Sequence, residues 1–233
     1  VQADALQAVI LPPDGRFDVP DPEHPGPTLS DAQAEAVAAL RDADNGFAVT
    51  LLDGVTGAGK TEVYFEAIAD ALRRGQQALV LLPEIALSAQ WLDRFEARFG
   101  ARPAEWHSDL SQRQRRKTWR AIAEGEARVV VGARSALFLP YPALGLIVVD
   151  EEHDPTYKQD EGLAYQARDL AIVRAKLEGA MVVLASATPS LESLANVQAG
   201  RYVHVHLPAR PGAAILPEIG TIDLRETPAE SGC

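Results

Sequence analysis

Short apolar runs alternate with longer amphipathic segments along this chain, and this alternation constrains the fold more than any other feature. The runs are GFAVTLLDG, QALVLLP, ARVVVG, LGLIVVD and AMVVLAS. Each run is apolar throughout rather than at every second position, which is typical of strands covered on both faces of a parallel sheet. The segments between them predict helices at residues 60–74, 87–99, 112–124, 167–177 and 190–199, and Ser30 is the N-cap of a further helix ending near Arg41. The sequence therefore predicts an α/β fold, with a mostly parallel sheet and helices on both faces.

The stretch GVTGAGKT, residues 54–61, lies between an apolar run and a predicted helix and fits the phosphate-loop pattern Gly-x-x-x-x-Gly-Lys-Thr. Glycines let the backbone bend so that successive amide groups face an anion, and the following helix adds its positive end. Lys60 can then reach the β- and γ-phosphates of a nucleotide, while the hydroxyl of Thr61 can bind Mg²⁺. The predicted nucleotide-binding residues of this loop are Gly54, Val55, Thr56, Gly57, Ala58, Gly59, Lys60 and Thr61.

Acidic residues and a histidine follow another apolar run, in the stretch DEEHD at residues 150–154. A phosphate-loop ATPase needs such a second strand, with Asp150 orienting Mg²⁺ and Glu151 polarising the attacking water. We expect His153 to contact the γ-phosphate or to couple hydrolysis to movement, although a loop histidine with a purely structural role is the alternative. Glu152 has two interpretations, a solvent-facing side chain or a partner for a nearby arginine.

A hydrolytic metal site is the competing interpretation of these residues, because Asp, Glu and His also bind metals. The order Glu-Glu-His differs from the helical His-Glu-x-x-His arrangement, which favours the ATPase interpretation. His204 and His206 share one face of a predicted strand, and we interpret them as structural residues rather than ligands. Cys233 is the only cysteine, so the chain can form neither an internal disulfide nor a cysteine-based zinc site.

Charge and hydropathy limit the classes of partner. The net charge is −11, from 22 basic and 33 acidic residues, which argues against a general nucleic-acid or anionic-membrane surface. Basic residues do concentrate at 113–120, either as a solvated helix face or as a phosphate-binding surface. Residues 1–15 lack a signal-peptide pattern and no apolar run is long enough for a bilayer, so we expect a cytoplasmic protein without a membrane partner.

Motifs in a fixed order carry a family resemblance: GVTGAGKTEVY, LLPEIALSAQ, VGARSALF, VVDEEHDPTYKQDEGLAYQARDLA and LASATPSLES. Together they resemble the PriA family of primosomal replication-restart helicases, which are superfamily 2 DNA helicases with a DEEH box. The resemblance covers roughly residues 28–225 and implies a RecA-like P-loop NTPase lobe that binds ATP. Residues 1–27 are then a linker or the tail of an upstream domain, and residues 226–233 are the tail of a truncated fragment.

This resemblance also implies the function. We expect the motor lobe of a 3′-to-5′ helicase that couples ATP hydrolysis to translocation on single-stranded DNA at stalled forks. ATP and Mg²⁺ are the implied cofactors. Single-stranded and forked DNA, primosome proteins and single-strand-binding proteins are the implied partners.

The resemblance assigns roles to residues outside the phosphate loop. Gln33 matches a glutamine that contacts adenine, although an ordinary polar helix residue is the alternative. The segment at 83–90, PEIALSAQ, matches one that borders the DNA track. Arg134 and Ser135 are candidate contacts to DNA phosphates, while Ala133 stands where the family more often has threonine.

Two later segments carry the remaining assignments. Tyr157, Lys158 and Tyr165 lie in a polar stretch, where exposed rings beside a cation can stack on unpaired bases. Tyrosines packed on a helix are the alternative. Ser186 and Thr188 match the segment that couples hydrolysis to movement between lobes.

The chain begins without Met, and no second phosphate-loop-like sheet follows Leu224. We therefore expect a fragment with one lobe. The resemblance implies that a second lobe with a cysteine-rich zinc insertion, and an N-terminal DNA-binding region, lie outside it. The isolated lobe is expected to be weakly active or inactive. A non-catalytic DNA-binding scaffold for primosome assembly is the alternative function, and another superfamily 2 translocase is a third.

Overall fold

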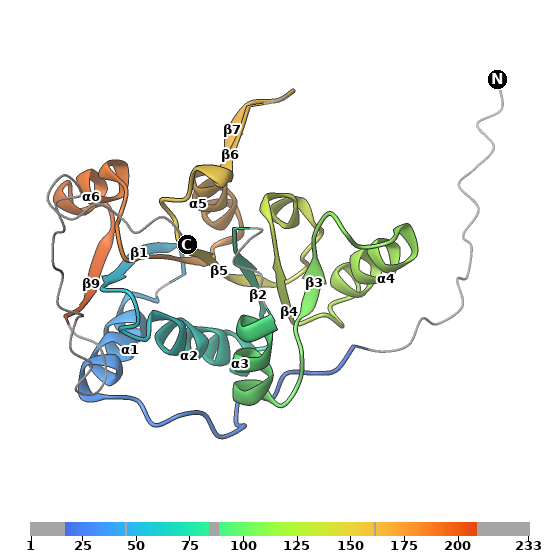
Figure 1. Cartoon of the computed structure of the whole chain (residues 1–233), viewed down its shortest axis with the longest axis horizontal. Coiled ribbons are helices and arrows are strands. Elements are labelled where there is room, and N and C mark those ends of the chain that lie inside the picture. The colour runs from blue at the N-terminus through green and yellow to red at the C-terminus, as the bar shows by residue number, and fades with distance from the viewer. Residues whose placement is uncertain (1–16, 45, 84–88, 161, 209–233) are drawn as a thin grey trace, which may run out of the picture.

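The computed structural model describes residues 17–44, 46–83, 89–160 and 162–208 (Figure 1). Its centre is a seven-stranded sheet with the strand order β3-β4-β2-β5-β8-β1-β9, in which every neighbouring pair is parallel. The strands are β1 Ala48–Gly54, β2 Gln77–Leu81, β3 Ala104–Trp106, β4 Val129–Gly132, β5 Leu144–Asp150, β8 Met181–Ser186 and β9 Val203–Leu207. The predicted parallel α/β architecture is confirmed.

Helices cover both faces of the sheet. They are α1 Asp31–Ala43, α2 Lys60–Arg73, α3 Ala89–Phe99, α4 Gln112–Ala123, α5 Ala167–Glu178 and α6 Leu191–Gln198, with one-turn helices η2 Arg134–Phe138 and η3 Pro155–Tyr157. Residues of α1, α2 and α3 share one apolar core with the sheet, and residues of α4 and α5 share a second core on the opposite face. Figure 1 shows α2 and α5 on opposite sides of the sheet.

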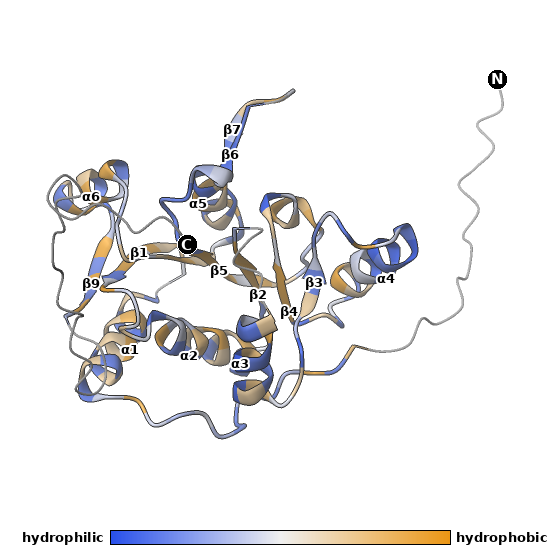
Figure 2. Cartoon of the chain, viewed as in Figure 1, coloured by the Kyte–Doolittle hydropathy of each residue, from blue (hydrophilic) through white to orange (hydrophobic). Residues whose placement is uncertain are grey.

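Local sequence signals explain these elements. The side chain of Ser30 accepts a hydrogen bond from the amide of Gln33, and the Gln33 side chain accepts one from the amide of Ser30, so a capping box starts α1. Strands β2, β4 and β8 are buried along their whole length, as expected for strands covered on both faces. Figure 2 shows hydrophobic residues concentrated in these central strands and polar residues on much of α4.

The strand predicted to carry His204 and His206 is the edge strand β9, beside β1. Some other elements differ from the sequence prediction. Strand β3 and the hairpin of β6 Lys158–Gln159 with β7 Tyr165–Gln166 were not predicted. These strands are too short to produce an apolar run.

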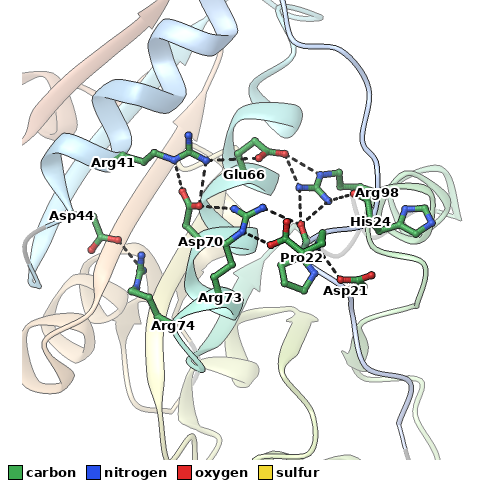
Figure 3. Close-up of polar contacts among 11 residues, drawn as sticks. Asp21, Pro22, His24, Arg41, Asp44, Glu66, Asp70, Arg73, Arg74 and Arg98 are labelled. Atoms are coloured by element: carbon green, nitrogen blue, oxygen red, sulfur yellow. Dashed lines mark hydrogen bonds and ion pairs between the residues drawn. The ribbon is translucent and has the colours of Figure 1, made fainter.

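Residues 21–24, within the described part of the predicted linker, lie beside α2 and α3 (Figure 3). The guanidinium of Arg98 is buried, lies 2.8 Å from Glu66, and donates hydrogen bonds to the backbone carbonyl groups of Pro22 and His24. This segment is therefore fixed to α2 and α3 although it has no regular secondary structure. Its assignment to an upstream domain stays a prediction.

Candidate nucleotide-binding site

The phosphate loop connects β1 to α2, as the sequence predicts. Gly57 and Gly59 have φ angles of 80° and 87°, in the left-handed region that favours glycine. A Cβ atom on Gly59 would lie 2.0 Å from Nε2 of Gln33, so a side chain at this position would collide with α1. Nε2 of Gln33 also donates a hydrogen bond to the carbonyl oxygen of Ala58. The loop conformation thus depends on both glycine and the neighbouring glutamine.

Lys60 folds back into this loop. Its Nζ atom donates hydrogen bonds to the carbonyl oxygens of Gly54, at 2.8 Å, and Val55, at 3.4 Å. Burial lowers the pKa of Lys60, and the negative charges of Glu151 and Asp150 oppose that effect. The ammonium group therefore lies between the loop carbonyls and the acidic residues at the end of β5.

Asp150 ends β5 and is held by a chain of hydrogen bonds. The hydroxyl of Tyr64 donates to Oδ2 of Asp150 across 2.9 Å, and the indole Nε1 of Trp91 donates to that hydroxyl across 2.8 Å. Burial is the main cause that raises the pKa of Asp150 to about 6, and the hydrogen bond from Tyr64 opposes it. Neither Tyr64 nor Trp91 was predicted from the sequence as a site residue.

Glu151 adopts an unusual backbone conformation. Its φ of 47° is the only positive value among the described residues other than glycine. Its amide donates to Oδ1 of Asp150 across 3.0 Å, and its carboxylate lies 3.6 Å from Nδ1 of His153. The same His153 nitrogen lies 2.8 Å from the hydroxyl of Ser186, at the end of β8. The acidic segment and the Ser-Ala-Thr segment are therefore in direct contact.

Glu152 is fully buried, which decides between its two interpretations in favour of an arginine partner. Its carboxylate lies 3.1 Å from a guanidinium nitrogen of Arg168, and it accepts hydrogen bonds from the backbone amide of Ser190 and the hydroxyls of Ser190 and Ser193. These partners belong to α5 and to the start of α6. Glu152 thus ties the end of β5 to both helices and points away from solvent.

A cleft of about 470 Å³ brings these segments together. Of the predicted residues, those that line it are Gln33, Thr56, Gly57, Gly59, Lys60, Thr61, Asp150 and Glu151. The lining does not include Gly54, Val55, Ala58 or His153. It does include residues that the sequence reasoning missed, namely Pro27, Thr28, Glu62 and Arg94. Arg94 forms an ion pair with Glu62, and no local motif indicated either.

The predicted DNA-contacting residues are only partly exposed. The expectation that Tyr157 is an exposed ring is wrong: its side chain is 1% exposed, and its hydroxyl donates to the carbonyl oxygens of Leu81 and Asp150. These two backbone acceptors explain how a polar ring enters the core. Tyr165 is half-buried and packs edge-on against exposed Phe138, with ring centroids 5.5 Å apart.

Other predicted contact residues lie near this ring pair or on neighbouring loops. Arg134 donates to the carbonyl oxygen of exposed Lys158, and the Ser135 hydroxyl accepts from the indole of Trp106 across 3.1 Å. The backbone amide of Thr188 donates a hydrogen bond to the hydroxyl of Ser186. Most of the predicted DNA-track segment, residues 84–88, lies outside the described residues.

The basic helix predicted at 113–120 corresponds to most of α4. Arg115 donates to the carbonyl oxygen of Ser108, and the ammonium of Lys117 lies 5.0 Å from the centroid of the Phe17 ring. These contacts are compatible with both earlier interpretations, a solvated face and a phosphate-binding surface.

The sequence pattern of the DEAD/DEAH box helicases matches residues 30–197. The chain belongs to this family. One relative of this DEAD/DEAH box helicase chain is the replication restart protein PriA of Rickettsia felis. The two are 49% identical over 198 residues, which cover 85% of this chain and 30% of the relative. The PriA protein of Bacillus subtilis is 46% identical over 201 residues, 85% of this chain and 25% of the relative. The predicted resemblance to PriA is confirmed, and the chain spans less than a third of either relative.

A solved structure of RecG bound to a three-way DNA junction has a similar fold. It superposes with a TM-score of 0.61 at 25% identity, over 79% of this chain and 24% of the RecG chain. The prediction of a RecA-like lobe is thereby confirmed for this DEAD/DEAH box helicase chain. Within the described residues, no helix combines the length and apolar character needed to cross a membrane.

Proposed function

We propose that this chain is the ATP-binding motor lobe of a replication-restart helicase that moves 3′ to 5′ along single-stranded DNA at stalled forks. The observation that carries the proposal is that Lys60, Thr61, Asp150 and Glu151 line one cleft although two separate loops supply them. Similarity to proteins named for replication restart supports that role. Forked DNA in the cytoplasm is the setting that we propose for it.

Lys60 is the residue that binds the phosphates. Its ammonium contacts two backbone carbonyl groups inside the loop. ATP binding replaces these neutral acceptors with anionic phosphate oxygens, so the bonds of the ammonium then join two charged groups. The amide groups of the glycine-rich loop and the start of α2 add further positive potential.

The donor set fits Mg²⁺. Thr61 and Asp150 offer a hydroxyl and a carboxylate oxygen, the ligand type that this cation prefers. Burial raises the pKa of Asp150, so a cation beside it favours the ionised carboxylate. When bound, Mg²⁺ supplies charge neutralisation of the phosphates.

Glu151 is the general base in this proposal. Its carboxylate is partly exposed in the cleft, where it can accept a proton from the attacking water. The amide contact with Asp150 fixes the backbone that carries it. The pair of His153 and Ser186 is the proposed link between hydrolysis and movement against a second lobe.

DNA binding is assigned to the surface around Tyr165, Phe138, Arg134 and Lys158. A half-buried ring against an exposed one is a suitable platform for unpaired bases, and exposed Lys158 lies on the paired strand of the same hairpin. Primosome proteins and single-strand-binding proteins are the proposed protein partners.

A scaffold with an idle nucleotide site is the second candidate function, and the intact Lys60, Asp150 and Glu151 favour the motor.

The test measures ATP binding and DNA-stimulated ATP hydrolysis in the full-length polypeptide with forked DNA. Lys60→Ala should abolish hydrolysis and leave fork binding intact. Glu151→Gln should bind ATP without hydrolysing it, because an amide is a poor proton acceptor. Lys176→Ala, a charge removal on the exposed side of α5, is the matched control and should behave as wild type. Wild-type turnover in Lys60→Ala, or a wild-type protein without DNA-stimulated turnover, would reject the motor function.

A further inference from the structure

Two histidines and an aspartate lie together on one face of the sheet, outside the nucleotide cleft. His204 and His206 are two residues apart on β9, so their side chains project to the same face. Asp53 lies opposite His206 in the parallel pairing of β1 with β9. The intervening Val205 packs into the core on the other face, together with α1 and α2. Strand pairing therefore brings three metal-ligand side chains to one place.

The side-chain atoms converge. Nε2 of His204 and Nδ1 of His206 each lie 2.9 Å from the same oxygen, Oδ1 of Asp53. One ligand atom from each of the three residues lies within 4.8 Å of the others. Zinc bonds to nitrogen and oxygen of about 2.0 to 2.2 Å in a tetrahedral site place ligand atoms about 3.3 Å apart. Small side-chain shifts would therefore make room for an ion.

We propose that Asp53, His204 and His206 form a binding site for a divalent transition metal of the Zn²⁺ type. Imidazole nitrogens suit Zn²⁺, Ni²⁺ and Cu²⁺, whereas Mg²⁺ prefers an all-oxygen set, so this site discriminates against the proposed nucleotide cation. Three protein ligands leave a further coordination position for water. The side chains of His204 and His206 are 41% and 54% exposed, so an ion can enter from solvent.

The position of the site gives it a structural consequence. Asp53 directly precedes Gly54, the first residue of the phosphate loop, and a Cβ atom on Gly54 would lie 2.6 Å from the carbonyl oxygen of Leu207. The loop entrance and the end of β9 are therefore in close contact. A metal that joins β1 to β9 fixes the edge strand to the strand that leads into the loop. Asp53 does not line the nucleotide cleft, although its charge acts on Lys60; we expect the metal to bind in the absence of nucleotide.

The experiment titrates the metal-free chain, without a polyhistidine tag, with ZnCl₂ in competition with a chromophoric chelator. Wild type should bind one equivalent, and excess MgCl₂ should not displace it. Asp53→Asn, His204→Gln and His206→Gln should each weaken Zn²⁺ binding by more than about 10-fold. Loss of a residue that only supports a metal ligand already lowers metal affinity by about 10- to 100-fold. His107→Gln is the matched control, because His107 also lies near carboxylates, 3.7 Å from Glu105 and 4.0 Å from Asp109.

A second measurement records the spectrum of an ion bound to the wild type, so its result does not depend on whether the variants fold. Co²⁺ added to wild type should produce the intense visible absorption of a site with low coordination number, and Zn²⁺ should abolish it. Zn²⁺ should also raise the Tm of wild type and of His107→Gln, but not of the three site variants. Unchanged Zn²⁺ affinity in the site variants, loss of binding in His107→Gln, or a weak octahedral Co²⁺ spectrum would overturn the proposal. Because none of these readouts uses ATP, they are independent of the proposed helicase function.

Discussion

The hydroxyl of Tyr64 donates a hydrogen bond to Oδ2 of Asp150 although the two residues are 86 positions apart in the sequence. Trp91 has only a donor on its indole ring, so its bond to the same hydroxyl leaves the Tyr64 proton directed at the carboxylate. The direction of this chain of hydrogen bonds is thereby fixed. Tyr64 is a positioning residue for the proposed Mg²⁺ ligand.

Tyr64→Phe should weaken the binding of Mg²⁺ at the nucleotide site, and so slow hydrolysis, without unfolding the protein. A hydrogen bond to a charged group contributes about 1.5 to 3 kcal/mol, which corresponds to a loss of roughly 10- to 150-fold in kcat/KM. The Mg²⁺ concentration at half-maximal hydrolysis should rise. The control is Tyr141→Phe, which also removes a buried hydroxyl, one bonded to the carbonyl oxygen of Ala136. Equal effects in both variants would show that Tyr64 acts only through stability.

Asp150 should destabilise the metal-free protein above neutral pH. Its pKa rises from 3.8 to about 6 in the folded protein, so the folded state binds this proton more tightly than the unfolded state does. The resulting loss in the free energy of unfolding is absent at low pH, grows as the pH rises from about 4 to 6, and has its full size above about pH 6. A shift of this size corresponds to about 3 kcal/mol, an upper bound because the carboxylate is only half-buried at the cleft.

Asp150→Asn should therefore raise the free energy of unfolding in EDTA at pH 8, by up to about 3 kcal/mol, while abolishing Mg²⁺-dependent hydrolysis. Urea denaturation at pH 8 and at pH 5 measures the difference. The stability gain should shrink at pH 5, where Asp150 is largely protonated in the wild type. A gain of the same size at both pH values would contradict the assigned ionisation.

Glu152 should matter for folding and not for the chemical step. Glu152→Gln leaves the buried guanidinium of Arg168 without its buried anionic partner, and losing one member of a buried pair typically costs about 3 kcal/mol or more. Glu192→Gln is the matched control, because Glu192 is exposed and lies 3.9 Å from the same guanidinium; its cost should stay below about 1 kcal/mol. Chemical denaturation measures both. A stable Glu152→Gln protein that binds ATP without hydrolysing it would instead make Glu152 catalytic.

Local patterns predicted what depends on local sequence. The central strands were recognised because burial on both faces makes each run apolar, and the phosphate loop because its glycines and Lys60 are adjacent. The contacts of Tyr64, and the convergence of Asp53 with His204, depend on strand order and helix packing, which no local pattern contains. Tyr157 was misjudged for a related reason, since its polar neighbours indicated exposure while distant carbonyl groups allow it to be buried.

The burial of Tyr157 changes which aromatic residue can sense DNA. Tyr165 packs edge-on against Phe138, which is 60% exposed, so this pair offers surface rings, and Lys158 lies on the strand paired with that of Tyr165. Tyr165→Ala should remove a stacking contribution of about 1 to 3 kcal/mol per base, which weakens single-stranded DNA affinity by roughly 5- to 150-fold. The basal ATPase rate should remain at the wild-type level, because Tyr165 does not line the nucleotide cleft. Fluorescence anisotropy with a labelled oligonucleotide and ATPase assays with and without DNA measure both quantities in the full-length polypeptide.

Tyr165→Phe is the control that separates stacking from hydrogen bonding, since it keeps the ring and removes the hydroxyl. Stacking predicts wild-type DNA affinity in Tyr165→Phe, a loss in Tyr165→Ala and a similar loss in Phe138→Ala. Tyr157→Phe tests the reassigned residue: it should cost stability, because two backbone carbonyl groups lose their donor, and leave DNA stimulation of the folded protein unchanged. If Tyr165→Ala and Phe138→Ala both keep full stimulation while a folded Tyr157→Phe loses it, the DNA signal passes through the buried tyrosine and the ring pair is only packing.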